Sequence, residues 1–590
     1  MRKIIDLINE VVQEAFAKCH YSPKYGITTL SNRSDLCQYQ CNGALSAAKE
    51  YKKRPMDIAN EVLGVLNQSS YFKQVDCVPP GFINIILEDQ FIVDYINRMN
   101  CDTKLGCDEI GKHETIIVDY GGPNVAKPLH VGHLRTAIIG ESIKRLGKFL
   151  GYNMLGDVHL GDWGLQIGLI IAELMRRFPD LVYFDSNYTE EYPTEAPFTI
   201  SELEEIYPAA SHFAKETPWF MEKAKEVTYM FQNGHKGYTA LWGHILHVSI
   251  KDLQKNYDKL NVYFDLWKKE SDAQAYIPEM IQFLKEKGYA YLSEGALVVD
   301  VKEDTDHKKI PPCILVKSDG ATLYSTTDLA TIVERSYLYN PIEIIYIVDK
   351  RQELHFEQVF RCAIKTGLIS SSTKLTFLGF GTMNGKDGKP FKTRDGGTMR
   401  LEKLISTVSD KVYQKVIANK DIKEEEAREI SNKIGLASLK YADLSNQISK
   451  DYIFDLERFT SFEGNTGPYI LYTTVRISSI LTKYHSFHSK NELEQVPIQL
   501  PLNENERILM LKILQFNEVI INSFKEYALH KICQYIYELS NVFNIFYHSN
   551  KILSEKDPIR QISWIKLVAL TRNILLSCLD LLGIEVPDKM

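Results

Sequence analysis

Two histidines, His130 and His133, stand three positions apart with Gly132 between them. At the start of a helix, imidazoles with this spacing lie on one side and can reach a single anion. A glycine between them lets a flat ring approach the backbone, because it carries no Cβ. The spacing therefore predicts a site that holds an anion and a planar group.

The flanking sequence places these histidines between a strand and a helix. The apolar run 116–118 predicts a buried strand, and apolar residues recur at helical spacing over residues 134–150. A segment punctuated by glycine and proline joins the two. Open α/β sheets hold phosphates at junctions of this kind, where a loop leads into a helix N-terminus.

A second basic cluster lies in residues 385–398, where lysines, an arginine and several glycines alternate. Glycines allow such a loop to close over phosphates, and its cations would neutralise charge that develops there. A flexible basic surface loop is the alternative interpretation. The phosphate-binding interpretation requires this loop and the two histidines to lie at one edge of the same sheet.

The string His-Val-Gly-His resembles the HIGH signature of class I aminoacyl-tRNA synthetases, and residues 122–133 as a whole are similar to the arginyl-tRNA synthetases of that class. The resemblance extends over the whole chain. It implies an enzyme that activates L-arginine with ATP to arginyl-adenylate and transfers arginine to the 3′-terminal ribose of tRNA(Arg). Members of this family generally need bound tRNA for the first step, so the same is expected here.

The family match assigns the nucleotide to both basic clusters. His130 and His133 would bind the triphosphate, and Gly132 would lie against the adenine or ribose. The cluster at 385–398 occupies the place of the KMSKS loop but departs from that pattern. Lys127 is therefore expected to supply the compensating charge, with Lys392 assisting. The other ATP-binding candidates in the cluster are Lys389 and Arg394.

Recognition of a guanidinium requires carboxylates in bidentate geometry, because the group is planar and permanently charged. Asp328 matches the family's arginine ligand, and Tyr324 lies four residues earlier on the same helical face. Glu270 is the expected second carboxylate. Three further residues are expected to hold the α-amino group: Asp119, Asn124 and Gln352. A buried site of this kind should reject lysine, which cannot fill the fork.

The pattern of elements predicts a multidomain α/β protein with three parts. Residues 1–108 read as a small α+β domain, which in this family contacts the tRNA elbow. Residues 109–405 alternate strands and helices, as a Rossmann-type parallel-sheet catalytic core does, with an insertion at about 180–290. Residues 406–590 show helical patterns only and predict an all-α bundle, resembling the family's anticodon-binding domain.

Composition limits the remaining possibilities. The 590 residues carry a net charge of −7, which argues against unspecific coating of nucleic acid, and DNA is not an expected partner. Ten cysteines without zinc spacing indicate reduced thiols and no protein-bound metal. Magnesium is expected to arrive with ATP, held through phosphates and water. A cytoplasmic monomer that does not enter a membrane is expected.

Two alternatives remain open at the level of sequence. Another class I nucleotidyl transferase would share the histidine chemistry but lack the Tyr324/Asp328 pair and both appended domains. A catalytically silent, synthetase-like tRNA-binding protein would tolerate loss of His130, His133 or Lys127. All three of these residues are present.

Overall fold

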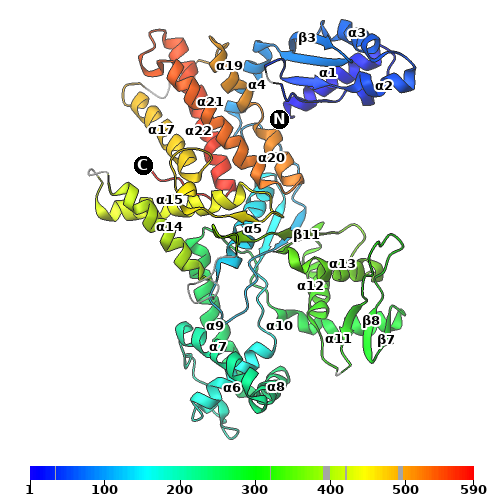
Figure 1. Cartoon of the computed structure of the whole chain (residues 1–590), viewed down its shortest axis with the longest axis vertical. Coiled ribbons are helices and arrows are strands. Elements are labelled where there is room, and N and C mark those ends of the chain that lie inside the picture. Colours follow the sequence, from blue (N-terminus) through cyan, green and yellow to red (C-terminus); the bar gives the residue numbers. More distant parts are fainter. Residues whose placement is uncertain (34, 319, 390–398, 419–421, 489–495) are drawn as a thin grey trace. The chain divides into compact units, whose positions relative to one another are not determined.

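The computed structural model describes residues 1–33, 35–318, 320–389, 399–418, 422–488 and 496–590. The chain forms two compact units (Figure 1). Unit 1 contains residues 1–110, 461–581 and 585–590, and unit 2 contains residues 111–460 and 582–584.

Unit 2 is built on a four-stranded parallel sheet with the strand order β11-β10-β5-β6. Its strands are β5 (Thr115–Asp119), β6 (Asn153–Asp157), β10 (Glu343–Asp349) and β11 (Lys374–Phe380). The register pairs Asp119 with Asp157 on one side and with Tyr346 on the other. Because the strands are parallel, their carboxyl ends, three of which are aspartates, meet at one edge.

Helix α5 (Val131–Phe149) packs against β5, β6 and β10 of this sheet. It begins three residues earlier than the apolar spacing predicts, because the side chain of His130 caps its first turn. The other helices of unit 2 are α6 (Leu165–Arg177), α7 (Ile200–Glu216), α8 (Pro218–Gln232), α9 (Lys236–Lys259), α10 (Glu270–Ala273), α11 (Ile277–Glu286), α12 (Tyr324–Tyr339), α13 (Glu353–Thr366), α14 (Leu401–Val416), α15 (Glu424–Leu444) and α16 (Leu456–Phe459).

Two parts of unit 2 differ from the sequence-based expectation. Residues 296–301, expected in the parallel sheet, instead supply β8 of a separate antiparallel sheet: β7 (Ala290–Ser293), β8 (Ala296–Val299) and β9 (Cys313–Val316). Strand signals were also expected to end at residue 406, yet β13 (Tyr452–Ile453) pairs in parallel with β12 (Met383–Asn384). Such short strands follow from tertiary pairing rather than from local pattern. Helices α14 and α15 belong to unit 2, although the predicted bundle included them.

Unit 1 combines a small sheet with helices. The antiparallel order β1-β2-β4-β3 joins β1 (Thr28–Leu30), β2 (Tyr39–Cys41), β3 (Phe72–Val78) and β4 (Phe82–Leu87). Its helices are α1 (Ile4–Lys18), α2 (Gly43–Tyr51), α3 (Pro55–Leu66), α4 (Asp89–Cys101), α17 (Gly467–His485), α19 (Glu504–Ile513), α20 (Phe516–Lys525), α21 (Leu529–Ser549) and α22 (Pro558–Leu581). The predicted fold class, an α+β N-terminal part, a parallel-sheet core and a helical C-terminal part, is confirmed.

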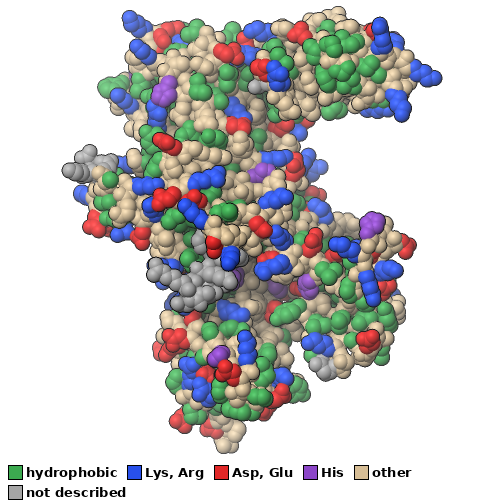
Figure 2. Space-filling view, in the orientation of Figure 1, with side chains coloured by type: hydrophobic (Ala, Val, Ile, Leu, Met, Phe, Trp, Pro, Cys, Tyr) green, Lys and Arg blue, Asp and Glu red, His purple; other side chains and the backbone are tan. Residues whose placement is uncertain are grey.

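Helix α22 is long and apolar enough to span a membrane by composition alone, with a mean hydropathy of 1.4. However, 67% of that apolar stretch is buried inside the protein, where α22 packs against α17 and α21. Its apolar character is therefore that of a core helix. On the surface, Figure 2 shows basic and acidic side chains interspersed over the visible face, as the small net charge implies.

Candidate active site

A cavity of about 590 Å³ lies at the carboxyl edge of the parallel sheet in unit 2. Open α/β folds bind ligands at this edge. Its walls come from the ends of β5, β10 and β11, the first turn of α5 and residues that precede β12. Six of the predicted site residues line it: Asp119, His130, Gly132, His133, Asp328 and Gln352.

The two histidines form one rigid pair at the start of α5. The backbone N–H of Gly132 donates to His130 Nδ1 at 3.0 Å, and the N–H of His130 donates to His133 Nδ1 at 3.1 Å. Their ring centroids are 3.9 Å apart. Because each Nδ1 accepts a hydrogen bond, the proton of each neutral imidazole lies on Nε2, which leaves two donors for an anion.

Burial keeps this pair uncharged. Desolvation, helped by the neighbouring His130, lowers the pKa of His133 to about 3. Desolvation also lowers the pKa of His130, with a smaller contribution from the positive charge of Lys127. Neutral imidazoles bind phosphate oxygens through hydrogen bonds, without a proton that must first be taken up.

Lys127 does not line the cavity, yet its ammonium is held in place. Its Nζ lies 4.5 Å from the centre of the Tyr207 ring, which extends from α7. Such a cation–π contact orients a lysine that would otherwise move freely. The predicted charge therefore stands beside the histidine pair, close enough to act on the pKa of His130.

Asp328, in helix α12, lines the same cavity. Its Oδ2 lies 2.6 Å from His355 Nε2. Burial raises the pKa of Glu270, and Asp328 is among the charges that raise it further. Tyr324 is 75% exposed, and its pKa is raised by partial burial and then by Glu270. Glu270 and Tyr324 thus stand near Asp328 but outside the cavity wall.

A buried arginine joins the ends of two strands beneath this region. Arg335 Nη2 donates to Asp119 Oδ2 at 2.6 Å and to Asp157 Oδ2 at 2.7 Å, and Arg335 is only 1% exposed. Burial raises the pKa of Asp119 even though Arg335 acts in the opposite direction. Asp119, which was expected to bind an amino group, therefore already has a cationic partner.

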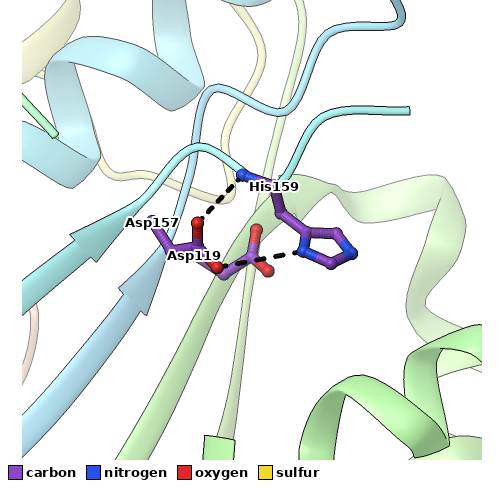
Figure 3. Close-up of side chains that lie close together, drawn as sticks. All are labelled: Asp119, Asp157 and His159. Atoms are coloured by element: carbon purple, nitrogen blue, oxygen red, sulfur yellow. Dashed lines mark hydrogen bonds and ion pairs between the residues drawn. The ribbon is translucent and has the colours of Figure 1, made fainter. Parts of the chain in front are cut away.

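His159 completes this group (Figure 3). Its N–H donates to Asp157 Oδ1 at 3.2 Å, its Nδ1 lies 3.8 Å from Asp157 Oδ2, and its φ of 38° is left-handed. The donor atoms of Asp119, Asp157 and His159 lie within 4.8 Å of one another, as in a metal site. A metal ion would have to displace Arg335, which already bridges the two carboxylates.

Asn124 and Lys389 are described but are not among the residues that line the cavity. Asn124 is exposed, and its side chain covers Gly161, where an added Cβ would clash with it. Lys389 is exposed, and its backbone carbonyl accepts from Gly385 N–H at 2.8 Å. Lys392 and Arg394 lie outside the described residues.

The site residues that sequence reasoning missed include Asp157, His159, Arg335 and His355. Asp157 and His159 follow an apolar run just as Asp119 does, so the same signal was available for them. Arg335 and His355 carried no signal, because each reads as a polar residue on a helix.

Comparison with known proteins gives matches along the whole chain. Residues 96–456 match the family model for the catalytic domain of class I (R) tRNA synthetases, residues 2–87 the arginyl tRNA synthetase N terminal domain, and residues 470–590 the DALR anticodon binding domain. The chain is 56% identical over 597 residues to the arginine–tRNA ligase of Agathobacter rectalis, with 100% of both chains covered. It is 42% identical over 589 residues to that of Francisella tularensis, again covering 100% of both chains.

Solved structures agree with this similarity. The arginyl-tRNA synthetase of Plasmodium falciparum superimposes with a TM-score of 0.83 at 26% identity, and 100% of both chains is covered. The Thermus thermophilus arginyl-tRNA synthetase gives 0.78 at 20% identity, again with 100% of both chains covered, and shows the shared fold.

Proposed function

The chain belongs to the arginyl-tRNA synthetases of class I, and we infer from this that it is an arginine–tRNA ligase. It activates L-arginine with ATP and transfers arginine to its tRNA. The observation that carries this conclusion is one cavity, at the carboxyl edge of a parallel sheet, that combines the His130/His133 pair with Asp328. The silent alternative is not favoured, because the relatives that match over the full length are ligases.

The histidine pair is proposed to bind the triphosphate of ATP. Adenylate formation requires attack of the arginine carboxylate on the α-phosphorus while pyrophosphate leaves, so it depends on positioning and charge compensation. The Nε2–H groups of His130 and His133 would donate to phosphate oxygens, and the exposed Gly132 would lie against the sugar or base. Lys127, whose charge acts on the pKa of His130, would compensate the leaving charge; Lys389, Lys392 and Arg394 would assist.

Arginine is proposed to lie between Asp328 and Asp119. The carboxylate of Asp328, whose Oδ2 contacts His355, would accept the guanidinium, with Glu270 and Tyr324 alongside. Asp119, Asn124 and Gln352 would receive the α-amino group at the sheet edge. Lysine would leave part of the fork unpaired, which costs a buried site heavily.

The appended parts are proposed to bind tRNA(Arg). Residues 1–108 would contact the elbow and the helical part, predicted from residue 406, would bind the anticodon. Arginine activation is proposed to need this bound tRNA. Magnesium would enter with ATP, and the protein would act as a cytoplasmic monomer, without DNA or a membrane as partner.

Arginine-dependent exchange between ATP and pyrophosphate, with and without tRNA(Arg), tests the proposal, with lysine as control. Exchange with arginine and tRNA only is the expected result. Exchange with arginine alone would keep the ligase but end the claim of tRNA dependence. Exchange that is equal with lysine would contradict the arginine site.

A further inference from the structure

Arg135 lies two residues after His133 in α5, and its side chain is only 2% exposed. Its Nε donates to Asp443 Oδ2 of α15 at 2.8 Å. Its Nη1 donates to the carbonyl oxygens of Gly381 at 2.7 Å and Lys450 at 3.1 Å. A single guanidinium thus joins α5, α15 and two loop segments of unit 2.

Gly381 belongs to a segment that forms one wall of the cavity, residues 381–383, here called the β12 wall. This wall is also held from its other side. Gly381 N–H donates to Ile448 O at 3.1 Å, and Thr382 N–H donates to Asp451 Oδ1 at 2.7 Å. The approach is so close that a Cβ on Gly381 would come within 2.5 Å of the Lys450 backbone and of Asp451 Oδ1.

We propose that Arg135 is a positioning residue for the nucleotide: by holding the Gly381 carbonyl, it fixes the β12 wall opposite the His130/His133 pair. The inference rests on the proposed function, because it assigns ATP to the space between them. Arg135 is itself among the residues that line the cavity, but its guanidinium contacts are with Asp443 and the two backbone carbonyls. Its Nη2 is shielded from solvent and has no hydrogen-bond partner among the residues that the structure describes.

The need for arginine follows from the three acceptors. A guanidinium presents five N–H donors in a fixed plane, so it can pair with Asp443 and reach two carbonyls at once. A lysine would keep the charge beside Asp443 but offers one mobile ammonium. Replacing Arg135 with lysine therefore loosens the β12 wall without leaving Asp443 unpaired.

Two variants test the wall from opposite sides. Arg135→Lys removes the tie to Gly381, and Gly381→Ala forces the wall away from Lys450. Arg507→Lys is the matched control in unit 1, because Arg507 similarly joins Asp89 Oδ1 at 2.6 Å and the Leu87 carbonyl at 3.0 Å. The full-length proteins are compared by titration calorimetry with ATP and magnesium, and by steady-state exchange with arginine and tRNA.

Both wall variants are expected to weaken ATP affinity about tenfold and to lower kcat for exchange further, since a displacement near 1 Å can cost two orders of magnitude. The KM for arginine should stay within about twofold, because that end of the cavity is untouched. Arg507→Lys should leave the ATP affinity unchanged, because the calorimetric titration contains only ATP and magnesium. If the variants only destabilise the fold, the unfolding midpoint should fall, and the ATP affinity and the KM for arginine should worsen together.

An ATP affinity within twofold of the wild type for both wall variants would overturn the inference. If Arg135→Lys does not fold, the double variant Arg135→Met with Asp443→Leu removes both buried charges and still lacks the Gly381 tie, so the same loss of ATP affinity is expected. Failure of the proposed function looks different: the wild type would bind ATP but show no arginine-dependent exchange.

Discussion

The two ends of the cavity are built from opposite kinds of groups. At the proposed nucleotide end, His130 and His133 are uncharged at neutral pH because of desolvation, and the Nδ1 of each ring accepts a hydrogen bond from a backbone N–H. At the proposed amino-acid end, Asp119 is the ionic partner of Arg335, and Asp328 Oδ2 contacts His355 Nε2. The histidine pair is held by backbone hydrogen bonds, whereas Asp119 already has a protein cation, Arg335, as its partner.

This contrast follows from what each end would bind. ATP brings several negative charges together with magnesium. Neutral donors can bind its phosphates without repelling the magnesium ion and without the cost of burying a charged side chain. Arginine brings cations, so its end needs carboxylates, and buried carboxylates need compensation when the site is empty. Arg335 supplies that compensation to Asp119. The difference predicts separate responses to mutation at the two ends.

Among these changes, removal of Arg335 should have the largest effect, and it should lower the stability of the fold. Arg335→Met leaves Asp119 and Asp157 buried without a cation, which is expected to cost about 3–5 kcal/mol in the free energy of unfolding. Denaturant unfolding monitored by circular dichroism measures it. Arg351→Met is the control, because Arg351 pairs with Asp349 at 2.6 Å while its side chain is 80% exposed. Equal costs for the two variants would contradict a buried ionic anchor.

Asp328→Asn should abolish most arginine recognition. The amide keeps the shape but loses the charge-assisted hydrogen bonds, so kcat/KM for arginine is expected to fall by roughly 10²–10³. Exchange kinetics at saturating ATP measure it. Asp306→Asn is the control, since Asp306 pairs with Arg361 at 2.8 Å outside the cavity. An unchanged KM for arginine in Asp328→Asn would remove this residue from the site.

The buried neutral state of His133 should appear as pH-dependent stability. Its pKa is about 3 when folded and near 6.5 when unfolded, so between these values the unfolded chain binds a proton that the folded chain does not. Stability from this group is therefore full above pH 6.5 and lost as the pH falls toward 3. Between pH 7 and 5 the wild type should lose about 2 kcal/mol more than His133→Asn. Parallel losses would show that His133 is charged in the folded protein.

The smallest expected effect concerns the support of Lys127. Tyr207→Leu removes the ring below the ammonium, and an exposed cation–π contact contributes about 0.5–1 kcal/mol, so exchange should slow two- to fivefold. Lys127→Ala should slow it considerably more. If the two variants are equally slow, Tyr207 has a larger role than orienting the lysine. If the exchange rate of Tyr207→Leu equals that of the wild type, Lys127 does not need the Tyr207 ring.

The sequence predicted the nucleotide end better than the amino-acid end. His130, Gly132 and His133 are contiguous, so a single local motif reports all three, and the structure places them on one wall. The amino-acid end is assembled from β5, α12 and residues near α13, which local periodicity cannot bring together. Arg335 and Arg135 were missed because a buried arginine on a helix looks like a surface residue until its distant partners, Asp157 and Asp443, are known.

Separate equilibrium titrations of ATP with magnesium and of L-arginine, into the wild type, His133→Asn and Asp328→Asn, test the central claim most directly. The account predicts a crossed result. His133→Asn should lose ATP affinity and keep arginine affinity within about twofold, and Asp328→Asn should do the reverse. Loss of both affinities in either folded variant would contradict a cavity with two separately built ends.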